Sequence, residues 1–403
     1  MSVLERLGGI ADIGRDPVRG GYSRHLLEPA EVILRQWFCR SARDLDLTVE
    51  KDGNGNLWAW WGDPGPGAIG TGSHLDSVPG GGAYDGPLGV VSAFEAVAIL
   101  QSEGWRPTRP VAICAFAEEE GSRFGMPCLG TRLLVGEIAP EEALARSDHE
   151  GVTLDEAWQR AGMDVSELGP DPDRVAQLAA FVELHVEQGV DLEERGRPLA
   201  VASAIMAHGR WRLTISGEGN HAGSTPMAGR RDPVVAASAA TLAVRDVALA
   251  HPSARGTVGR IAVTPNGTNV IASRVDAWLD IRAHSDKEVR VQLDSTLALI
   301  RKCVAAEGCE LEFDEESFSP LVVFDRPLTE CIADVLGGAP AIPTGAGHDA
   351  GVLSAYLPAA MIFVRNPTGI SHAPGEMARD EDCEEGARGL AEVLRELAGE
   401  PLP

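Results

Sequence analysis

The 403-residue sequence predicts an α/β protein with a mostly parallel sheet, covering helices and an inserted small α/β sandwich domain. Three observations support this prediction. Strand and helix patterns alternate over the first third of the chain, the order typical of a parallel sheet covered by helices. The middle of the chain has its own strand–helix–strand–strand–helix order, which favours a small α/β sandwich. The chain is also longer than a single hydrophobic core usually supports, which favours two domains.

The first third of the chain contains alternating helix and strand signals. The expected elements are a helix at 29–44, a hairpin at 49–61, a strand at 68–73, a helix at 88–102 and a strand at 111–117. The hairpin turn reads Asp-Gly-Asn-Gly, a strong turn signal. The strand at 111–117 is a continuous apolar run, as in strands that are buried on both faces. In such sheets ligands collect at the carboxyl ends of the strands, where His74 and the glutamates after residue 117 fall.

The middle and the end of the chain define the predicted domain boundaries. The expected elements are strands at 211–215, 256–263 and 275–281 and helices at 233–250 and 293–307. We place the inserted domain at 206–318, which divides the first domain into segments 1–205 and 319–403. After the insertion the first sheet is expected to resume, with a short segment at 340–343, a strand at 361–364 and a helix at 381–398.

Composition and charge exclude several classes of function. The chain carries 35 basic and 60 acidic residues, a formal net charge of −25, whereas a nucleic-acid or anionic membrane surface needs basic patches. No uncharged apolar stretch reaches the ~18 residues of a membrane span, and residues 1–12 contain no apolar core of a secretory signal. The seven cysteines are odd in number and show no C-x-x-C spacing, so we expect neither disulfides nor a cysteine zinc site. A reducing, cytoplasmic location fits these features best.

Two segments that follow the strand predicted at 68–73 offer metal ligands. His74 stands in a His-x-Asp sequence, and on an extended segment Asp76 points the same way and can fix the tautomer of His74. Asp85 follows in the glycine-rich segment 79–86, where glycines permit a tight turn that aims a carboxylate at an ion. The two oxygens of a carboxylate can also bridge two cations. Taken singly, these segments have two alternatives, a hydrogen-bonded surface pair and a plain glycine loop.

Three consecutive glutamates follow the apolar strand at 111–117. The carboxylates of Glu118, Glu119 and Glu120 repel one another and need a cation or shared protons. Because successive side chains cannot all reach one point, we expect their roles to divide, with Glu120 as a ligand and Glu119 as a general base. The alternative is a solvated acidic turn.

Two histidines complete the candidate ligand set. His185 lies in an alternating segment in which Glu183 and Glu187 share its strand face, and His372 lies in a Gly-Ile-Ser-His sequence near the C-terminus. Each histidine alone is more often structural than ligating. Together with the carboxylates they provide ligands for two ions that share Asp85, which suits Zn²⁺, Mn²⁺ or Co²⁺ with open positions for water.

Six segments, taken in order, carry a family resemblance. They are Gly-Ser-His-Leu-Asp-Ser-Val-Pro at 72–79, Tyr-Asp-Gly at 84–86, Glu-Glu-Glu-Gly-Ser-Arg-Phe at 118–124, Glu-Leu-His-Val-Glu-Gln-Gly at 183–189, Gly-Ala-Gly-His-Asp-Ala at 345–350 and Gly-Ile-Ser-His at 369–372. They resemble the zinc amidases of hydantoinase/carbamoylase type, which include N-carbamoyl-L-amino-acid hydrolases and allantoate amidohydrolases and belong with the aminoacylases and di-zinc exopeptidases. The resemblance covers nearly the whole chain. It implies a di-zinc exopeptidase-like catalytic domain and an inserted lid domain that forms a homodimer.

The resemblance also implies roles for individual residues. The implied metal ligands are His74, Asp85, Glu120, His185 and His372, with Asp85 bridging two divalent ions. The expected ions are Zn²⁺, with Mn²⁺, Co²⁺ or Ni²⁺ as alternatives. Glu119 is the implied general base and proton shuttle.

Residues of the inserted domain are implied to bind a small carboxylated substrate. His221 matches a histidine that crosses to the partner subunit's site, and Asn269 and Arg282 match binders of the substrate carboxylate. Chemistry agrees, since a guanidinium fork fits a carboxylate and an imidazole N–H can stabilise an oxyanion. From the residues alone, a surface strand arginine and a histidine in a glycine-rich turn are the alternatives. Gln188 and His348 are weaker candidates for substrate contacts.

Two segments depart from the family pattern. Residues 207–211 carry His208 and more bulk than is usual there, and Arg365 opens a segment before the last ligand where many members have small residues. Both segments can shape the pocket, so they bear on the substrate rather than on the metal chemistry.

The sequence therefore predicts a di-metal amidohydrolase that cleaves the linear amide or ureido C–N bond of a small carboxylated substrate. The leading substrates are N-carbamoyl-L-amino acids and allantoate, whose carbamoyl hydrolysis releases ammonia and carbon dioxide. N-formyl or other N-acyl amino acids are the alternative within this class, followed by dipeptides. A non-catalytic metal-binding scaffold is the alternative from a different class. Such a scaffold would be expected to lose the base or a ligand, and all six positions are filled.

Overall fold

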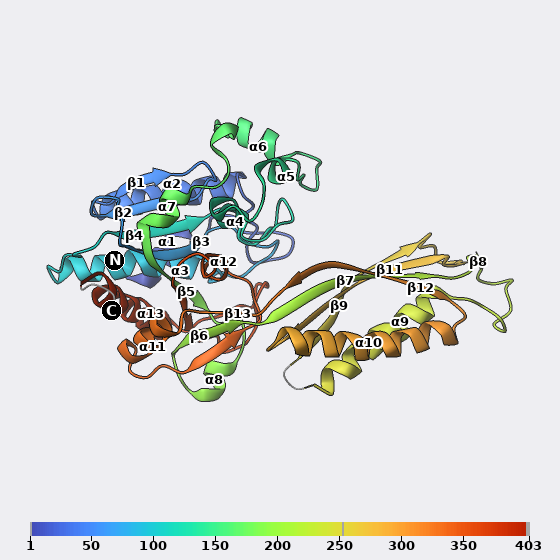
Figure 1. The fold of residues 1–403 in the computed structure, drawn as a ribbon. Coiled ribbons are helices and arrows are strands. Elements are labelled where there is room, and N and C mark those ends of the chain that lie inside the picture. Colours follow the sequence, from blue (N-terminus) through green and yellow to red (C-terminus); the bar gives the residue numbers. More distant parts are fainter. Residues whose placement is uncertain (1, 252–253, 400–403) are drawn as a thin grey trace. The chain divides into compact units, whose positions relative to one another are not determined.

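A computed structural model describes residues 2–251 and 254–399 (Figure 1). The chain separates into two compact units. We call the first, Met1–Ala204 with Val323–Pro403, the large unit, and the second, Ile205–Val322, the inserted unit. The insertion predicted from the sequence is 206–318, and the predicted outer bounds, residues 1 and 403, lie outside the described residues. Within the described ranges, no helix combines the length and apolarity that a membrane span requires.

The large unit is built on one sheet with the strand order β1-β2-β4-β3-β5-β15-β6-β13, and β14 pairs with β6. The strands are β1 Thr48–Lys51, β2 Leu57–Trp61, β3 Ala68–His74, β4 Val111–Phe116, β5 Leu178–Val186, β6 Leu199–Ile205, β13 Val322–Val323, β14 Ala341–Thr344 and β15 Ala359–Val364. The central strands β4, β3, β5 and β15 pair in parallel, whereas β1, β2 and β6 pair antiparallel on either side. The predicted α/β class is therefore confirmed, with the parallel part of the sheet at its centre.

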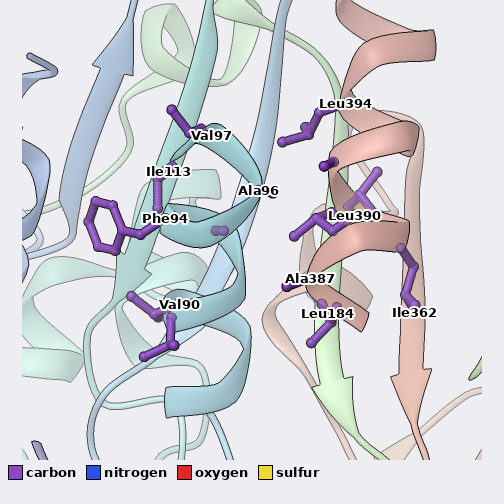
Figure 2. Packing of buried hydrophobic residues seen from close by; sticks show 14 of the residues in the cluster. Val90, Phe94, Ala96, Val97, Ile113, Leu184, Ile362, Ala387, Leu390 and Leu394 are labelled. Carbon is purple, nitrogen blue, oxygen red and sulfur yellow. The ribbon is translucent and has the colours of Figure 1, made fainter. Parts of the chain in front are cut away.

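Helices cover this sheet and enclose its core. The longer ones are α1 Val3–Ile10, α2 Pro29–Asp44, α3 Pro87–Ser102, α11 Arg326–Val335 and α13 Asp380–Gly399, and the shorter ones are α4 Leu129–Val135, α5 Pro140–Leu144, α6 Leu154–Arg160, α7 Pro172–Gln177, α8 Asp191–Arg195, α12 Asp349–Leu353 and a 3₁₀ turn at Val165–Glu167. Figure 2 shows Val90, Phe94 and Val97 of α3 in the same hydrophobic cluster as Leu390 and Leu394 of α13. Because α3 packs against both the sheet and α13, its sequence is apolar on nearly every side.

The parallel pairing explains why the candidate ligands meet. β3 ends at His74, β4 ends just before Glu118, and His185 is the penultimate residue of β5. The segment that carries His372 follows β15, the fourth parallel strand. Carboxyl ends of parallel strands lie at one edge of a sheet, and the loop with Asp85 leaves the same edge after β3.

The inserted unit is a four-stranded antiparallel sheet with two helices on one face (Figure 1). Its sheet order is β12-β7-β11-β9. Its elements are β7 Ala207–Ser216, β8 Asn220–His221, α9 Pro233–Leu249, β9 Arg255–Thr264, β10 Val270–Ile271, β11 Arg274–Ala283, α10 Asp286–Ala306 and β12 Glu310–Ser319. Along β11, the buried residues Val275, Ala277, Leu279 and Ile281 alternate with more exposed ones, so one face packs on the helices. β8 and β10 form a separate two-stranded ribbon, called the β8–β10 ribbon below.

Candidate metal centre

The predicted metal ligands converge at one edge of the central sheet. Ligand atoms of His74, Asp85 and His185 lie within 4.8 Å of one another, and so do those of Asp85, Glu120 and His372. The structure thus brings all five residues together, in two groups that share Asp85. The two strand histidines are fully buried, whereas the imidazole of His372 is half exposed and leaves the second group accessible.

Asp85 places one carboxylate oxygen in each group. Its Oδ1 lies 3.1 Å from His185 Nε2 and 3.5 Å from His74 Nε2, and its Oδ2 lies 3.4 Å from His372 Nε2. His372 Nε2 also lies 3.3 Å from Glu120 Oε2. Tetrahedral ligands at the bond lengths typical of zinc stand roughly 3.3 Å apart, so both groups have the spacing of metal ligands.

The tautomers of the buried histidines suit metal binding. His74 Nδ1 lies 3.1 Å from the backbone oxygen of Asp76, and His185 Nδ1 lies 2.9 Å from that of Val186. A carbonyl oxygen only accepts, so each Nδ1 carries a hydrogen and each neutral ring keeps its lone pair on Nε2. Both Nε2 atoms are buried and have no hydrogen-bond partner among the described residues. A buried polar atom without a hydrogen bond destabilises the fold. A cation between these lone pairs and the carboxylates would remove this destabilisation.

The carboxylates around these histidines favour positive charge at the site. Burial alone would lower the pKa of His74, but Glu119, Asp76 and Asp85 outweigh it and hold that pKa well above its ordinary value. Burial would raise the pKa of Asp85, yet His185 and His74 hold it well below its ordinary value. Positive charge therefore stabilises the cluster, either as protons on the imidazoles or as metal ions.

Asp76 directs Glu119 and Glu120 to different places. Its Oδ1 accepts the backbone N–H of Glu119 at 3.3 Å, and its Oδ2 accepts that of Glu120 at 3.1 Å. Glu120 then faces His372, whereas Glu119 Oε2 lies 3.7 Å from His74 Nε2. Burial raises the pKa of both glutamate carboxyls well above their ordinary range. A carboxyl with a raised pKa takes up a proton more readily than an exposed one, which suits acid–base chemistry.

Two weaker candidates, Gln188 and His348, lie against the ligands. Gln188 Nε2 donates to Asp85 Oδ2 at 3.0 Å, and its Oε1 is buried with no hydrogen-bond partner in the part of the chain that the structure describes. The His348 ring lies 4.5 Å from the His185 ring, and within residues 2–251 and 254–399 neither of its buried nitrogens has a hydrogen-bond partner. Burial and the charge of His185 hold the pKa of His348 well below its ordinary value, so its ring is neutral.

Several contacts at this centre were not predicted from the sequence. Glu183 accepts a hydrogen bond from Ser73 Oγ at 2.7 Å, and Cys128 Sγ lies 3.6 Å from Glu119 Oε1. Glu376 accepts two backbone N–H groups of the glycine-rich loop. The period-two pattern of β5 was an available signal for Glu183, which shares the strand face of the ligand. Cys128 and Glu376 lie in loops, where no periodic signal marks them.

In the inserted unit, His221 and Asn269 lie side by side at the β8–β10 ribbon. The strand pairing and a 3.0 Å hydrogen bond from Ala222 N–H to the backbone oxygen of Asn269 hold them together. His221 Nδ1 accepts the backbone N–H groups of Gly223 and Ser224, each at 3.1 Å. A neutral ring held in this way carries its hydrogen on Nε2, so its exposed edge is a hydrogen-bond donor.

The structure does not bring Arg282 together with this ribbon. The strand register pairs Arg274 with Ser216, beside the ribbon, and Arg282 with His208. The eight residues from Arg274 to Arg282 span roughly 26 Å at the rise of a strand. Arg282 Nε and Nη2 donate to Asp280 Oδ1 and Oδ2 at 2.8 and 3.0 Å, so its guanidinium is already aligned as a two-pronged donor.

The two segments that depart from the family pattern have partners within their own units. His208 Nδ1 lies 3.2 Å from the backbone oxygen of Met206. Arg365 Nε and Nη2 donate to the carboxylate of Asp382 at 2.8 and 2.9 Å. The Arg365 guanidinium thus anchors the segment before His372 to the first turn of α13.

Known proteins with similar sequences and structures identify the family. Residues 70–396 match the model of the peptidase family M20/M25/M40. The chain is 36% identical over 401 residues to the N-carbamoyl-L-amino acid amidohydrolase of Geobacillus stearothermophilus, covering 98% of this chain and 97% of that protein. It is 32% identical over 414 residues to the allantoate amidohydrolase of Escherichia coli K12, covering 98% of both. The solved structure of a hydantoinase/carbamoylase family amidase from Burkholderia vietnamiensis is similar with a TM-score of 0.86 at 31% identity, covering 99% of this chain and 97% of that one. The chain therefore belongs to the peptidase family M20/M25/M40, and its predicted membership of the hydantoinase/carbamoylase amidases is confirmed.

Proposed function

We propose that this chain is a di-metal amidohydrolase that acts on the linear, non-peptide C–N bond of a small carboxylated substrate. The observation that carries this proposal is the carboxylate of Asp85, which has one oxygen in each of two ligand groups beside the raised-pKa carboxyl of Glu119. Relatives matched along nearly their whole length are named N-carbamoyl-L-amino acid amidohydrolase and allantoate amidohydrolase. The chemistry of the site and the names of the relatives thus support the same reaction class.

Two divalent cations are the proposed cofactors. His74, Asp85 and His185 would hold one, and Asp85, Glu120 and His372 would hold the other. Imidazole and carboxylate ligands suit Zn²⁺, with Mn²⁺, Co²⁺ or Ni²⁺ as alternatives. When bound, the ions polarise the substrate carbonyl and lower the pKa of water at the site. Three protein ligands in each group leave room for water and substrate.

Glu119 is the proposed general base and proton shuttle. Its Oε2 lies 3.7 Å from His74 Nε2, so the carboxylate borders the first ligand group without belonging to it. Glu119 takes a proton from the attacking water and returns it to the leaving nitrogen. Burial raises its pKa, so this carboxylate takes up a proton more readily than an exposed one. Asp76 fixes the turn by accepting the backbone N–H of Glu119.

The inserted unit carries the proposed substrate contacts. His221 would donate its Nε2–H to the oxyanion that forms at the attacked carbonyl. Arg282, whose guanidinium is oriented by hydrogen bonds to Asp280, would bind the substrate carboxylate, and Asn269 would add an amide donor. In the large unit, Gln188 and His348 stand beside the metal ligands as further candidates for substrate contact.

A homodimer is the proposed assembly, with His221 crossing to the partner subunit's site. The β8–β10 ribbon and Arg282 lie at opposite ends of β11, separated by roughly 26 Å of strand. One small substrate can therefore meet His221, Asn269 and Arg282 together only if the ribbon comes from a second copy. The outer strand β9 and helix α9 offer apolar surface for such a partner, since Ile261 is 50% exposed and Leu242 is 51% exposed.

A product assay tests the proposed reaction class. The purified chain, loaded with Zn²⁺ or Mn²⁺, is given N-carbamoyl-L-amino acids, allantoate, N-formyl and N-acetyl amino acids, and dipeptides in separate reactions. Release of ammonia and carbon dioxide from a carbamoyl substrate or allantoate is the expected result. Formate or acetate without ammonia would assign acyl hydrolysis instead, and free amino acids from dipeptides alone would assign a dipeptidase. Failure to turn over any substrate with two ions bound would overturn the catalytic proposal.

A further inference from the structure

We propose that Glu376 is a positioning residue that joins the loop of Asp85 to the turn of His372 and so holds the second ligand group together. This inference rests on the proposed function, because it concerns the cation that Asp85, Glu120 and His372 would share. Glu376 belongs to none of the candidate ligand groups found among the described residues, yet it lies four positions after His372 in the sequence.

Glu376 binds the backbone of the glycine-rich loop. Its Oε1 accepts the N–H of Tyr84 at 2.9 Å and the N–H of Asp85 at 3.0 Å, across 292 and 291 residues of sequence. Two donors that converge on one carboxylate oxygen fix the position and the direction of the peptide that enters Asp85. Glu376 therefore positions the Asp85 carboxylate, which both ligand groups share, by binding the backbone of Asp85.

A hydroxyl links the same glutamate to the side chain of Asp85. Ser371 Oγ lies 3.2 Å from Asp85 Oδ2 and 3.4 Å from Glu376 Oε2. Between Ser371 and Glu376 stands His372, whose φ of 55° is in the left-handed region. A histidine persists in that conformation when its surroundings hold it, and the contacts of Ser371 and Glu376 do so from both sides.

The glycine-rich loop is shaped to admit this side chain. A Cβ on Gly82 would stand 2.1 Å from Glu376 Oε1 and 2.2 Å from its Cδ, so only glycine lets the carboxylate approach the loop backbone. Glu376 is 6% exposed, and its partners are two backbone N–H groups and one hydroxyl rather than a cation.

The two ligand groups should depend on Glu376 unequally. His74 and His185 stand on β3 and β5, where paired neighbouring strands hold them. Asp85 and His372 stand on loops, and Glu376 connects those two loops. Loss of its carboxylate should therefore loosen the second ligand group more than the first.

The test measures Zn²⁺ binding by the full chain, through competition with a chromophoric chelator and metal content after dialysis. Wild type should hold two ions. Glu376→Ala should keep the first ion and bind the second about 10- to 100-fold more weakly, the effect expected when a group that orients ligands is lost. Glu376→Gln should bind like wild type, because one amide oxygen can accept both backbone N–H groups and the amide N–H can donate to Ser371 Oγ. Gly82→Ala, which displaces the carboxylate without removing it, should also weaken the second ion.

Asp148→Ala is the matched control for loss of a loop-bracing carboxylate. Asp148 Oδ1 accepts the backbone N–H groups of Glu150 at 3.0 Å and Val152 at 2.9 Å, so its loss should lower the Tm and leave both ions bound. Two ions bound with wild-type affinity in both Glu376→Ala and Gly82→Ala would overturn the positioning role, as would equal weakening in Glu376→Gln and Glu376→Ala. A wild-type chain that binds fewer than two ions would overturn the proposed function itself, so the two failures are distinguishable.

Discussion

The buried ligand cluster of the large unit and the exposed β8–β10 ribbon of the inserted unit both contain histidines, but they fix opposite tautomers of the imidazole ring. His74 and His185 are completely buried, and a backbone oxygen fixes each Nδ1 as the protonated nitrogen. His221 is exposed on a two-residue strand, and two backbone N–H groups fix its Nδ1 as the acceptor. The buried rings therefore keep a lone pair on Nε2, as a metal ligand needs, whereas His221 keeps a hydrogen there, as an oxyanion donor needs.

Charge compensation also differs between the two units. Burial raises the pKa of the carboxyls of Glu119 and Glu120, which have more negative neighbours than positive ones. In the inserted unit, burial would raise the pKa of Asp280 as well, but Arg282 and Arg210 outweigh it and lower that pKa. The buried ligand cluster would be stabilised by an added cation, whereas Asp280 in the inserted unit already has arginines as counter-charges.

Removal of divalent ions should therefore produce the largest effect and should act on the buried cluster. After dialysis against a chelator we expect activity to fall below detection and the Tm to drop. Ions that bind only the folded state stabilise it by ~4 kcal/mol when free ion is present at about 1,000 times its Kd. Turnover assays and calorimetry measure both losses, and added Zn²⁺ or Mn²⁺ should reverse them.

Chelator saturated with Ca²⁺ is the control for effects of the chelator itself. Full turnover by protein in which metal analysis finds no ions would contradict the di-metal site.

Glu119→Gln separates proton transfer from ion binding within the buried cluster. The variant should retain both ions, because Glu119 belongs to neither ligand group, and should lose roughly 10²- to 10⁴-fold in kcat. Steady-state kinetics and metal analysis of the same preparation measure the two quantities. Glu120→Gln is the matched comparison, since it changes a ligand and should lower the ion content as well. Normal turnover by Glu119→Gln would mean that a group other than Glu119 is the general base.

An exchange experiment tests whether the exposed ribbon acts on the partner's site. His221→Ala should lose roughly 10²- to 10³-fold in kcat, as expected for loss of an oxyanion donor. When His221→Ala and Glu119→Gln chains exchange subunits, each mixed dimer keeps one complete site, because Glu119 of one copy meets His221 of the other. About half of the dimers should be mixed, so the mixture should regain about a quarter of wild-type kcat.

The double variant, with both changes in one chain, is the control. Its exchange with either single variant should restore no activity, because no site then has both Glu119 and His221. A mixture no more active than its two parents would show that His221 acts within its own chain or not at all.

The sequence predicted the buried cluster better than it predicted the surroundings of the ribbon, for a physical reason. The patterns at 29–44 and 111–117 are periodic or continuously apolar, and they became α2 and β4. His74, Glu120 and His185 met because parallel strands present their carboxyl ends at one edge, a rule that needs strand order but no knowledge of contacts. The convergence of these side chains could thus be predicted before any distance was known.

Loops and strand register lie beyond such reasoning. The contact between Glu376 and the Asp85 loop joins two irregular segments almost 300 residues apart, and α4 to α7 are too short to show a periodic pattern. The strand β12 alternates acidic and apolar residues at a largely exposed edge and was not predicted. The separation of Arg282 from Asn269 depends on the register of β11 with β7, which one sequence does not show.

The smallest effect is expected inside the inserted unit, at the ion pair of Asp280 and Arg282. A carboxyl whose pKa is lower in the folded than in the unfolded state stabilises the fold above pH ~4, and this stabilisation fades as the pH falls toward its folded pKa. Asp280→Asn should therefore lower the free energy of unfolding by roughly 1 kcal/mol at neutral pH, the upper range for a partly exposed pair, and by less near pH 4. Urea titrations across this pH range measure the difference, with Asp314→Asn, at a more exposed pair with Arg212, as a control that should lose less. A difference that grows as the pH falls would mean that Asp280 is not compensated by its arginines, and the contrast in charge between the two units would then fail.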